Sequence, residues 1–298
     1  MNRGYNLLDC LLCPNCLAKL VHLKSESLIC LNCIQVFKIE DHIIHLLPSK
    51  LDSCGRTEDE VWKNHEREGI EKPPWMALIH KRDEINYFLD QVLPDLSLKG
   101  VVLEIGAGSC WASSLIKYRF QECYVVATDI SPHALRKGQQ ICNIIGASPD
   151  AFINCDIEHL PFAPGLFDVV IGNAILHHLT DLKRGLSFIN RVLKPGGTLI
   201  INGEIACGKL FSFVLQSRIG LAGRRRKELG VNENAYSYQE WQKMLLDSHF
   251  KEIRLSFEKN WQYRLYHWFP PVYYKIIGGF PQYLLKFIPC GIRITAIK

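Results

Sequence analysis

Residues 101–111 read VVLEIGAGSCW, and this stretch decides the fold. Val101, Val102, Leu103 and Ile105 favour β-structure, which predicts a buried strand. Gly106 and Gly108 permit a tight turn and a close approach of the backbone to a ligand. Residues 112–118 can then open a helix whose N-terminal amides face that loop. The sequence therefore predicts a strand that delivers a ligand-binding loop.

Glu104 narrows the ligand that this loop can hold. A glycine loop of this kind usually suggests a dinucleotide, but a carboxylate two residues before Gly106 would repel a pyrophosphate. A P-loop is excluded because no Gly-Lys-Ser or Gly-Lys-Thr follows. A cationic ligand suits the loop better, and a tight turn in another α/β fold is the alternative.

A second β-rich run, residues 123–128, ends at Asp129, which lies 21 residues after Gly108. That distance holds one helix and one strand. Asp129 is therefore expected at the carboxyl end of the neighbouring strand, where it can accept hydrogen bonds from both ribose hydroxyls. Since NAD enzymes carry an acidic residue at the same offset, the two patterns indicate only a nucleoside cofactor.

With three later segments, these patterns resemble the ordered motifs of the class I S-adenosylmethionine (SAM) dependent methyltransferases, of the type 11 kind. Residues 154–162, NCDIEHLPF, resemble the third motif, and residues 167–179, FDVVIGNAILHHL, resemble the fourth strand and the loop after it. An amphipathic helical pattern over residues 182–193 then ends in KPGG before a strand at 198–203. The sequence departs from the family at Cys110, where a third glycine is common.

The resemblance implies SAM as the cofactor. The glycine loop and Glu104 would hold its methionine end, Asp129 its ribose, and Asp156 with the next residue would lie beside the adenine. The cofactor-binding residues expected on this basis are Glu104, Gly106, Gly108, Asp129, Ile130, Asp156, Ile157 and Asn173.

The methyl acceptor is harder to predict. Methyltransferases that act on adenine or cytosine amino groups typically carry Asn/Asp-Pro-Pro-Tyr/Phe after the fourth strand, whereas this chain has NAIL from Asn173. His177 and His178 stand where the acceptor should approach, and either is a candidate general base for O-methylation because imidazole titrates near neutrality. A structural role is the alternative, since methyl transfer can proceed by positioning alone.

The first part of the chain carries a different pattern. Cys13, Cys16, Cys30 and Cys33 form two CxxC pairs separated by thirteen residues, which is near the zinc-ribbon spacing. One such pair suits redox chemistry or chance equally well, but two pairs predict a structural zinc held by four thiolates. His42 and His45 are then expected on the ribbon surface.

The ribbon and the segment FKIEDHIIHLLP at residues 37–48 are similar to the activator subunit of tRNA methyltransferases. They also resemble ribbons that precede the catalytic domain in bacterial methyltransferases, including some that act on ribosomal RNA. The similarity implies that the ribbon offers a surface for a protein partner.

Three parts are expected: a zinc ribbon at residues 1–48, a linker at 49–74 and a methyltransferase domain at 75–298. The last should be a Rossmann-like α/β fold with a mostly parallel seven-stranded sheet. A helix over residues 76–93 is expected to cover the cofactor, with Trp62, His65 and Tyr87 either near the active site or simply packed. Residues 205–238, with the basic run 224–227, and the aromatic stretch 261–290 are expected to be lids; for the aromatic stretch, packing against the sheet is the alternative.

Composition sets wider bounds. The 298 residues are 48% hydrophobic, enough for one sizeable core and a small module. A net charge of +5 permits contact with RNA or anionic lipid without arguing for either. Residues 1–9 lack a signal-peptide pattern, and twelve cysteines suit the reducing cytosol, so a cytoplasmic protein is expected.

The leading prediction is methyl transfer from SAM to a small-molecule or lipid-like acceptor in a biosynthetic pathway, with residues 261–290 as an acceptor wall or a membrane-surface contact. An RNA methyltransferase is the first alternative, supported by the ribbon and the basic run. A non-catalytic SAM-binding partner subunit is the second.

Overall fold

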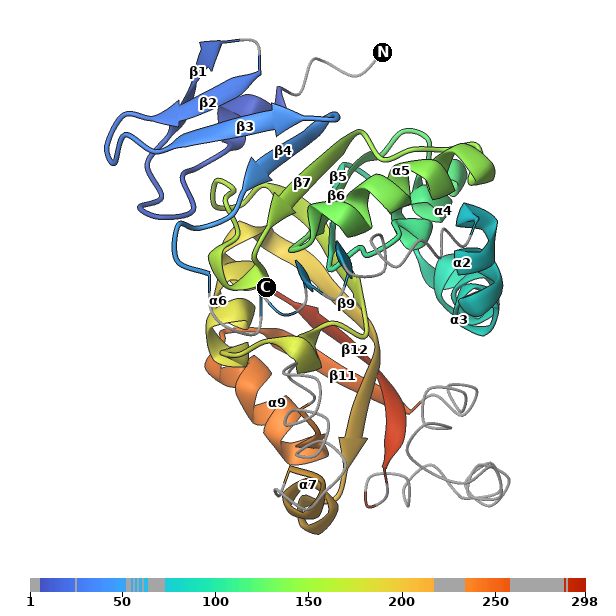
Figure 1. The fold of residues 1–298 in the computed structure, drawn as a ribbon. Helices are drawn as coiled ribbons and strands as arrows, with labels where there is room; N and C mark the ends of the chain where they lie inside the picture. Colours follow the sequence, from blue (N-terminus) through green and yellow to red (C-terminus); the bar gives the residue numbers. More distant parts are fainter. Residues whose placement is uncertain are drawn as a thin grey trace.

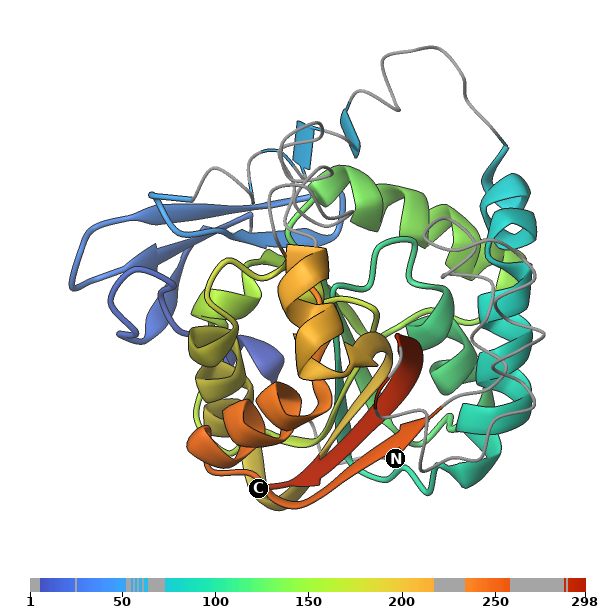
Figure 2. The same cartoon turned by 90° about the horizontal axis from the view of Figure 1, so that it is seen from below.

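The computed structural model describes residues 6–24, 26–51, 55, 57, 59, 60, 62, 63, 73–216, 234–257, 287 and 289–298. Its centre is a continuous sheet in the order β1-β2-β3-β4-β7-β6-β5-β8-β9-β12-β11, with β10 (Tyr236–Ser237) paired to β9. Helices cover both of its faces (Figures 1 and 2).

Seven strands of this sheet confirm the predicted mostly parallel fold. β5 (Val101–Ile105), β6 (Tyr124–Asp129), β7 (Ala151–Cys155), β8 (Phe167–Asn173) and β9 (Leu193–Cys207) run parallel. β12 (Cys290–Ile297) is antiparallel and lies between β9 and β11 (Lys251–Phe257). β5 is therefore central and fully buried, as the four apolar residues around Glu104 predict.

The two faces of the sheet carry separate cores, because side chains alternate along a strand. Val102 of β5 packs on the side of α4 (Trp111–Arg119) and α5 (Pro132–Ile145). Leu103 packs on the side of α6 (Leu182–Val192) and α9 (Tyr238–Asp247). The glycine loop after β5 is thus held between two packed layers.

The single helix predicted over residues 76–93 is instead divided. α2 (Pro74–His80) and α3 (Arg82–Tyr87) meet at Lys81, and a π-helical turn η2 (Phe88–Val92) and a short 3-10 turn η3 (Leu93–Asp95) follow. Phe88 packs edge-on against Trp111, with ring centroids 5.3 Å apart. Tyr87 is buried and its hydroxyl accepts a hydrogen bond from Arg293, so the packing role fits it. His65 lies outside the described residues.

The cysteine-rich segment extends the main sheet. It comprises η1 (Leu7–Cys10), β1 (Leu20–Lys24), β2 (Ser27–Cys30), β3 (Val36–Glu40) and β4 (Ile43–Leu46), and β4 runs parallel to β7 (Figure 1). Leu12 N donates to Pro161 O at 2.8 Å, and Ala163 N donates to Cys10 O at 2.8 Å. Leu11 and Leu46 share one core with the strands and α6. The ribbon segment and the α/β domain are therefore joined by both sheet pairing and apolar packing.

The surface position predicted for His45 is wrong. The residue is half-buried, and its Nδ1 lies 3.2 Å from Asn154 Oδ1. The sheet pairing explains the difference, because it places His45 opposite Asn154 of β7. His42, in the turn before β4, is exposed as predicted.

Both expected lid segments are described only in part. After β9 the chain forms α7 (Lys209–Gln216), whereas residues 224–227 and nearly all of 261–290, including Trp268 and Tyr274, lie outside the described residues. None of the helices that the structure describes has the length and apolar character needed to cross a bilayer.

Candidate active site

A pocket opens at the carboxyl ends of the parallel strands, the place where open α/β sheets bind ligands. All of the predicted cofactor-binding residues line it, and so does His178; His177 does not. The predicted residues in its wall are Glu104, Gly106, Gly108, Asp129, Ile130, Asp156, Ile157, Asn173 and His178.

The glycine loop forms one wall of the pocket. Gly106 and Gly108 have φ values of +60° and +52°, the left-handed region that favours glycine. A Cβ on Gly106 would collide with Ile175 Cγ1, so a side chain there has no room. Cys110 is also left-handed, with φ +54°, and its Sγ lies only 2.5 Å from where a Cβ on Gly138 would be. Glycine at position 138 thus leaves room for the Cys110 thiol.

Glu104 lies almost wholly buried beneath this loop, with 2% of its surface exposed. Its carboxylate accepts hydrogen bonds from the backbone N, at 2.9 Å, and from the hydroxyl of Ser113. Burial raises the pKa of Glu104 to about 7, although the Ser113 hydrogen bonds oppose that shift. A cation bound next to the carboxylate would favour its ionised form.

Asp129 is the last residue of β6, and both of its carboxylate oxygens accept hydrogen bonds from the backbone. Oδ2 accepts from Gly108 N at 2.7 Å, and Oδ1 accepts from Ser131 N at 2.9 Å. Since an ionised carboxylate offers about four acceptor positions, two remain for hydroxyl donors of a ligand. Burial raises the pKa of Asp129 to about 6, against these backbone hydrogen bonds.

Asp156 precedes the short turn η4 (Ile157–His159) and fixes it. Its Oδ1 accepts from Glu158 N at 2.9 Å, and its Oδ2 lies 2.8 Å from His159 Nδ1. Ile157, in this turn, and Ile130, just after β6, add apolar side chains to the lining. This part of the pocket can hold a flat ring with polar edges.

His177 and His178 lie in η5 (Leu176–His178) and have different surroundings. His177 is buried, with its Nδ1 2.9 Å from Glu204 Oε2, whereas His178 lines the pocket. Glu204 is itself fully buried, and its other oxygen accepts from the backbone N of Leu176 at 2.8 Å. The arrangement suits His177 to holding the turn and leaves His178 facing a ligand.

Sequence reasoning missed Glu204 and part of the lining. The available signal was an acidic residue at the end of the apolar strand that contains Ile200 and Ile201. The missed lining includes Trp111, Thr180 and an ion pair in which Lys81 Nζ lies 2.9 Å from Glu84 Oε1. Trp62, predicted to lie near the active site or to pack, also lines the pocket.

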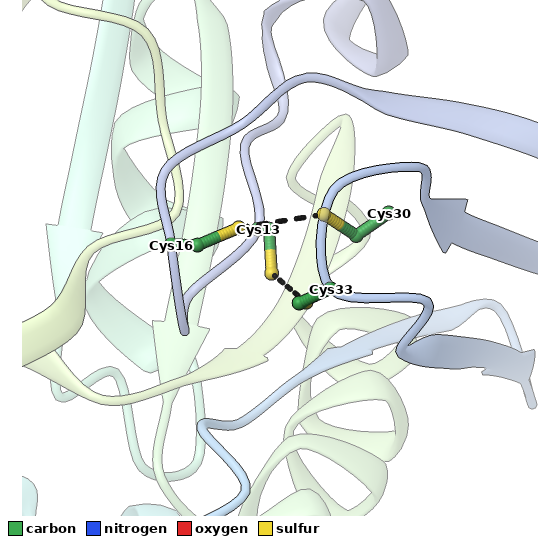
Figure 3. Close-up of side chains that lie close together, drawn as sticks. All are labelled: Cys13, Cys16, Cys30 and Cys33. Carbon is green, nitrogen blue, oxygen red and sulfur yellow. Dashed lines mark hydrogen bonds between the residues drawn. The ribbon is translucent and has the colours of Figure 1, made fainter.

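The four predicted metal ligands cluster away from this pocket. The Sγ atoms of Cys13, Cys16, Cys30 and Cys33 all lie within 4.8 Å of one another. Figure 3 shows two close pairs, Cys13 with Cys33 and Cys16 with Cys30. The two Sγ atoms are 3.5 Å apart in the first pair and 3.4 Å apart in the second. Zinc–sulfur bonds of ~2.3 Å in a tetrahedron place the sulfurs roughly 3.8 Å apart, so the donor set fits zinc.

Residues 103–201 match the methyltransferase domain family. An uncharacterized methyltransferase of Mycobacterium tuberculosis (strain ATCC 25618 / H37Rv) is 32% identical over 128 residues, which cover 43% of this chain and 59% of that protein. A malonyl-[acyl-carrier protein] O-methyltransferase of Chlorobium phaeovibrioides is 30% identical over 131 residues, covering 44% of this chain and 50% of that protein. The chain thus spans less than two thirds of the length of these curated relatives.

Among solved structures, the chain is similar to a complex between the Haloferax volcanii Trm112 methyltransferase activator and a methyltransferase. The TM-score is 0.52 at 13% identity, and the match covers 84% of this chain and 99% of the other. At that identity the likeness shows the fold alone. Residues 103–201 thus match the methyltransferase domain family, and they lie within a Rossmann-like α/β fold of the methyltransferase kind.

Proposed function

We propose that this chain is a SAM-dependent methyltransferase that acts on a small-molecule or lipid-like acceptor. The observation that carries the proposal is the meeting of two buried carboxylates, Glu104 and Asp129, around the left-handed glycine loop. A dinucleotide would bring its pyrophosphate against Glu104, whereas SAM brings an ammonium group and a sulfonium.

The residues of the pocket fit SAM. Glu104 would accept from its ammonium group, and the two open acceptor positions of Asp129 would receive the ribose hydroxyls. Asn173 lines the pocket beside Glu104, and a hydrogen bond from its side chain opposes the rise in the pKa of that carboxyl. Asp156, with Ile130 and Ile157, would enclose the adenine.

SAM would supply an electrophilic methyl group. The task of the protein is then to hold the acceptor atom in line and to exclude water. His178 lines the pocket and can take a proton from a hydroxyl acceptor. Glu204 and His177 hold the turn that presents His178. Trp62, Trp111 and the Lys81–Glu84 pair line the same pocket and would bound the acceptor side.

Replacing Asp129 with alanine should weaken SAM binding by roughly 1.5 to 3 kcal/mol, the scale of hydrogen bonds to a charged group. Calorimetric titration measures the change, with Asp247→Ala as the matched control because Asp247 is exposed on α9. Unchanged affinity in Asp129→Ala would show that the ribose binds elsewhere and would refute the role assigned to Asp129 at the end of β6.

The acceptor class rests on sequence as well as on the pocket. The relative named as a malonyl-[acyl-carrier protein] O-methyltransferase favours a carboxyl or hydroxyl acceptor over a nucleobase amine. The absence of Pro-Pro after Asn173 favours the same choice. Residues 205–238 and 261–290 are proposed as lids on the acceptor side, the second because of its aromatic composition.

The direct test follows methyl transfer from labelled SAM to a lipid extract, to acyl-carrier-protein thioesters and to RNA, each in separate reactions. Label in the lipid or thioester fraction supports the proposal. Label in RNA alone would favour the RNA methyltransferase. SAM binding without transfer to any of the three would favour a non-catalytic SAM-binding subunit.

For the cysteine cluster we propose a structural zinc ribbon at residues 1–48, joined by a linker at 49–74 to a catalytic domain at 75–298. The support is the four-sulfur cluster together with the pairing of β4 to β7. Through that pairing the ribbon would serve the catalytic domain from within the same chain, as an activator subunit does from outside. A further protein partner would meet the ribbon at its second knuckle, where Leu31 and Ile34 are each 67% exposed.

A further inference from the structure

The ribbon reaches the cofactor pocket through a chain of side-chain hydrogen bonds as well as through its backbone. His45 of β4 lies opposite Asn154 of β7, with His45 Nδ1 3.2 Å from Asn154 Oδ1. Asn154 Nδ2 donates in turn to the carbonyl oxygens of Asp129, at 3.1 Å, and Ile130, at 2.8 Å. Neither His45 nor Asn154 lines the pocket, whereas Asp129 and Ile130 both do.

The direction of these hydrogen bonds is determined by the groups involved. Because the Asn154 amide nitrogen serves two carbonyls, the atom facing His45 is an acceptor, and His45 Nδ1 must carry the proton. His45 Nε2 is buried without a hydrogen-bond partner among the described residues.

The turn held in this way presents the Asp129 carboxylate. Asn154 is 1% exposed and fixes the two carbonyls at the end of β6. Next to them, Asp129 Oδ1 accepts a hydrogen bond from Ser131 N, and Asp129 Oδ2 accepts one from Gly108 N. The linker contacts the same turn, since Ser131 Oγ donates to Asp59 Oδ1 at 2.9 Å. Hydrogen bonds thus connect the ribbon, through Asn154, and the linker, through Asp59, to the segment that is assigned to ribose binding.

We propose that His45 is a positioning residue through which the zinc ribbon sets the affinity for SAM. This inference rests on the proposed function. When β4 is ordered, His45 fixes the orientation of Asn154. Asn154 in turn fixes the turn after Asp129, and this turn directs the Asp129 carboxylate towards the ribose hydroxyls. By linkage, SAM binding must stabilise the ribbon to the same degree that the ribbon favours SAM binding.

A matched pair of substitutions isolates the hydrogen bond. His45→Asn keeps an N–H donor at the position of His45 Nδ1, whereas His45→Leu has the same shape as that asparagine and no donor. His22→Ala is the control, because His22 is exposed on β1 of the same ribbon. Each protein is first checked for zinc content and thermal unfolding, and is then titrated with SAM and with S-adenosylhomocysteine by calorimetry.

The expected result is about fivefold weaker binding of both ligands by His45→Leu, the size of one net hydrogen bond. His45→Asn should stay within about twofold of wild type and His22→Ala should be unchanged. In Asn154→Ala the additional His45→Leu change should have no further effect, because the pathway is already broken.

Equal affinity of His45→Leu and wild type, with zinc retained, would overturn the proposal. Equal losses in His45→Leu and His45→Asn would also overturn it, since they would show that packing and not the hydrogen bond is responsible. If wild-type protein itself fails to bind SAM, the proposed function fails first, so the two failures are distinguishable.

Discussion

Glu104→Gln should abolish most SAM binding and at the same time stabilise the ligand-free protein at alkaline pH. The substitution removes the buried carboxylate that we assign to the ammonium group of SAM. Losing one partner of a buried ion pair costs about 3 to 5 kcal/mol, so binding at pH 8 should weaken by a factor of about 100 or more. Calorimetry measures the loss, with Glu40→Gln as the control because Glu40 is exposed on β3.

The effect on stability has the opposite sign. Burial raises the pKa of Glu104 from 4.5 to about 7 in the folded chain. Above pH 7 the folded protein must hold a buried charge that the unfolded chain solvates, so this residue lowers stability as the pH rises from 4.5 through 7. Glu104→Gln should therefore be more stable at pH 9, by on the order of 2 kcal/mol, and nearly equal to wild type at pH 5. Urea unfolding at the two pH values measures this, and a variant less stable at both would contradict it.

The same pKa predicts how wild-type affinity depends on pH. SAM should require ionised Glu104, so its dissociation constant should rise as the pH falls below about 7. Glu104→Gln lacks this group, and its residual binding should lose that part of the pH dependence. Asp129, with a pKa of about 6, should account for the part that persists at lower pH.

Cys13→Ala combined with Cys16→Ala should remove zinc and destabilise the whole chain. Wild-type protein should contain about one zinc per chain. Zinc binding in small ribbons supplies most of their folding free energy, and here β4 also covers the edge of β7 and shares its apolar core. The melting temperature should fall by about 10 °C or more.

Metal analysis and thermal unfolding test this expectation, and Cys10→Ala is the control because Cys10 lies outside the four-sulfur cluster. Retained zinc in the double variant would refute the metal site. Loss of zinc with unchanged melting would show that the ribbon is not part of the cooperative unit.

The strand and loop at residues 101–111 could be predicted from sequence because their signals are local. The apolar residues Val101 to Leu103 and Ile105 indicate a buried strand, and Gly106 and Gly108 indicate a tight turn. The spacing from Gly108 to Asp129 then predicted a second carboxylate at the carboxyl end of the neighbouring strand. In the structure Glu104 and Asp129 line the same pocket.

The sequence could not predict which strands pair when they are far apart along the chain. Residues 43–46, IIHL, show that a strand exists but carry no information about its neighbour, so the parallel contact with β7 was not foreseen. The misplaced His45 follows directly from that omission. The break at Lys81 was missed for another reason, since the apolar spacing over residues 76–93 continues through it. Glu204 carried no motif, and its role depends on Leu176 and His177, which are distant in sequence.

The most direct test of the central claim is a calorimetric titration of zinc-loaded wild-type protein with SAM at pH 8, repeated in the presence of excess NAD⁺. The account predicts one saturable SAM site per chain that NAD⁺ does not compete for, because Glu104 disfavours a pyrophosphate. Absence of SAM binding by the folded, zinc-loaded protein, or displacement of SAM by NAD⁺, would contradict it.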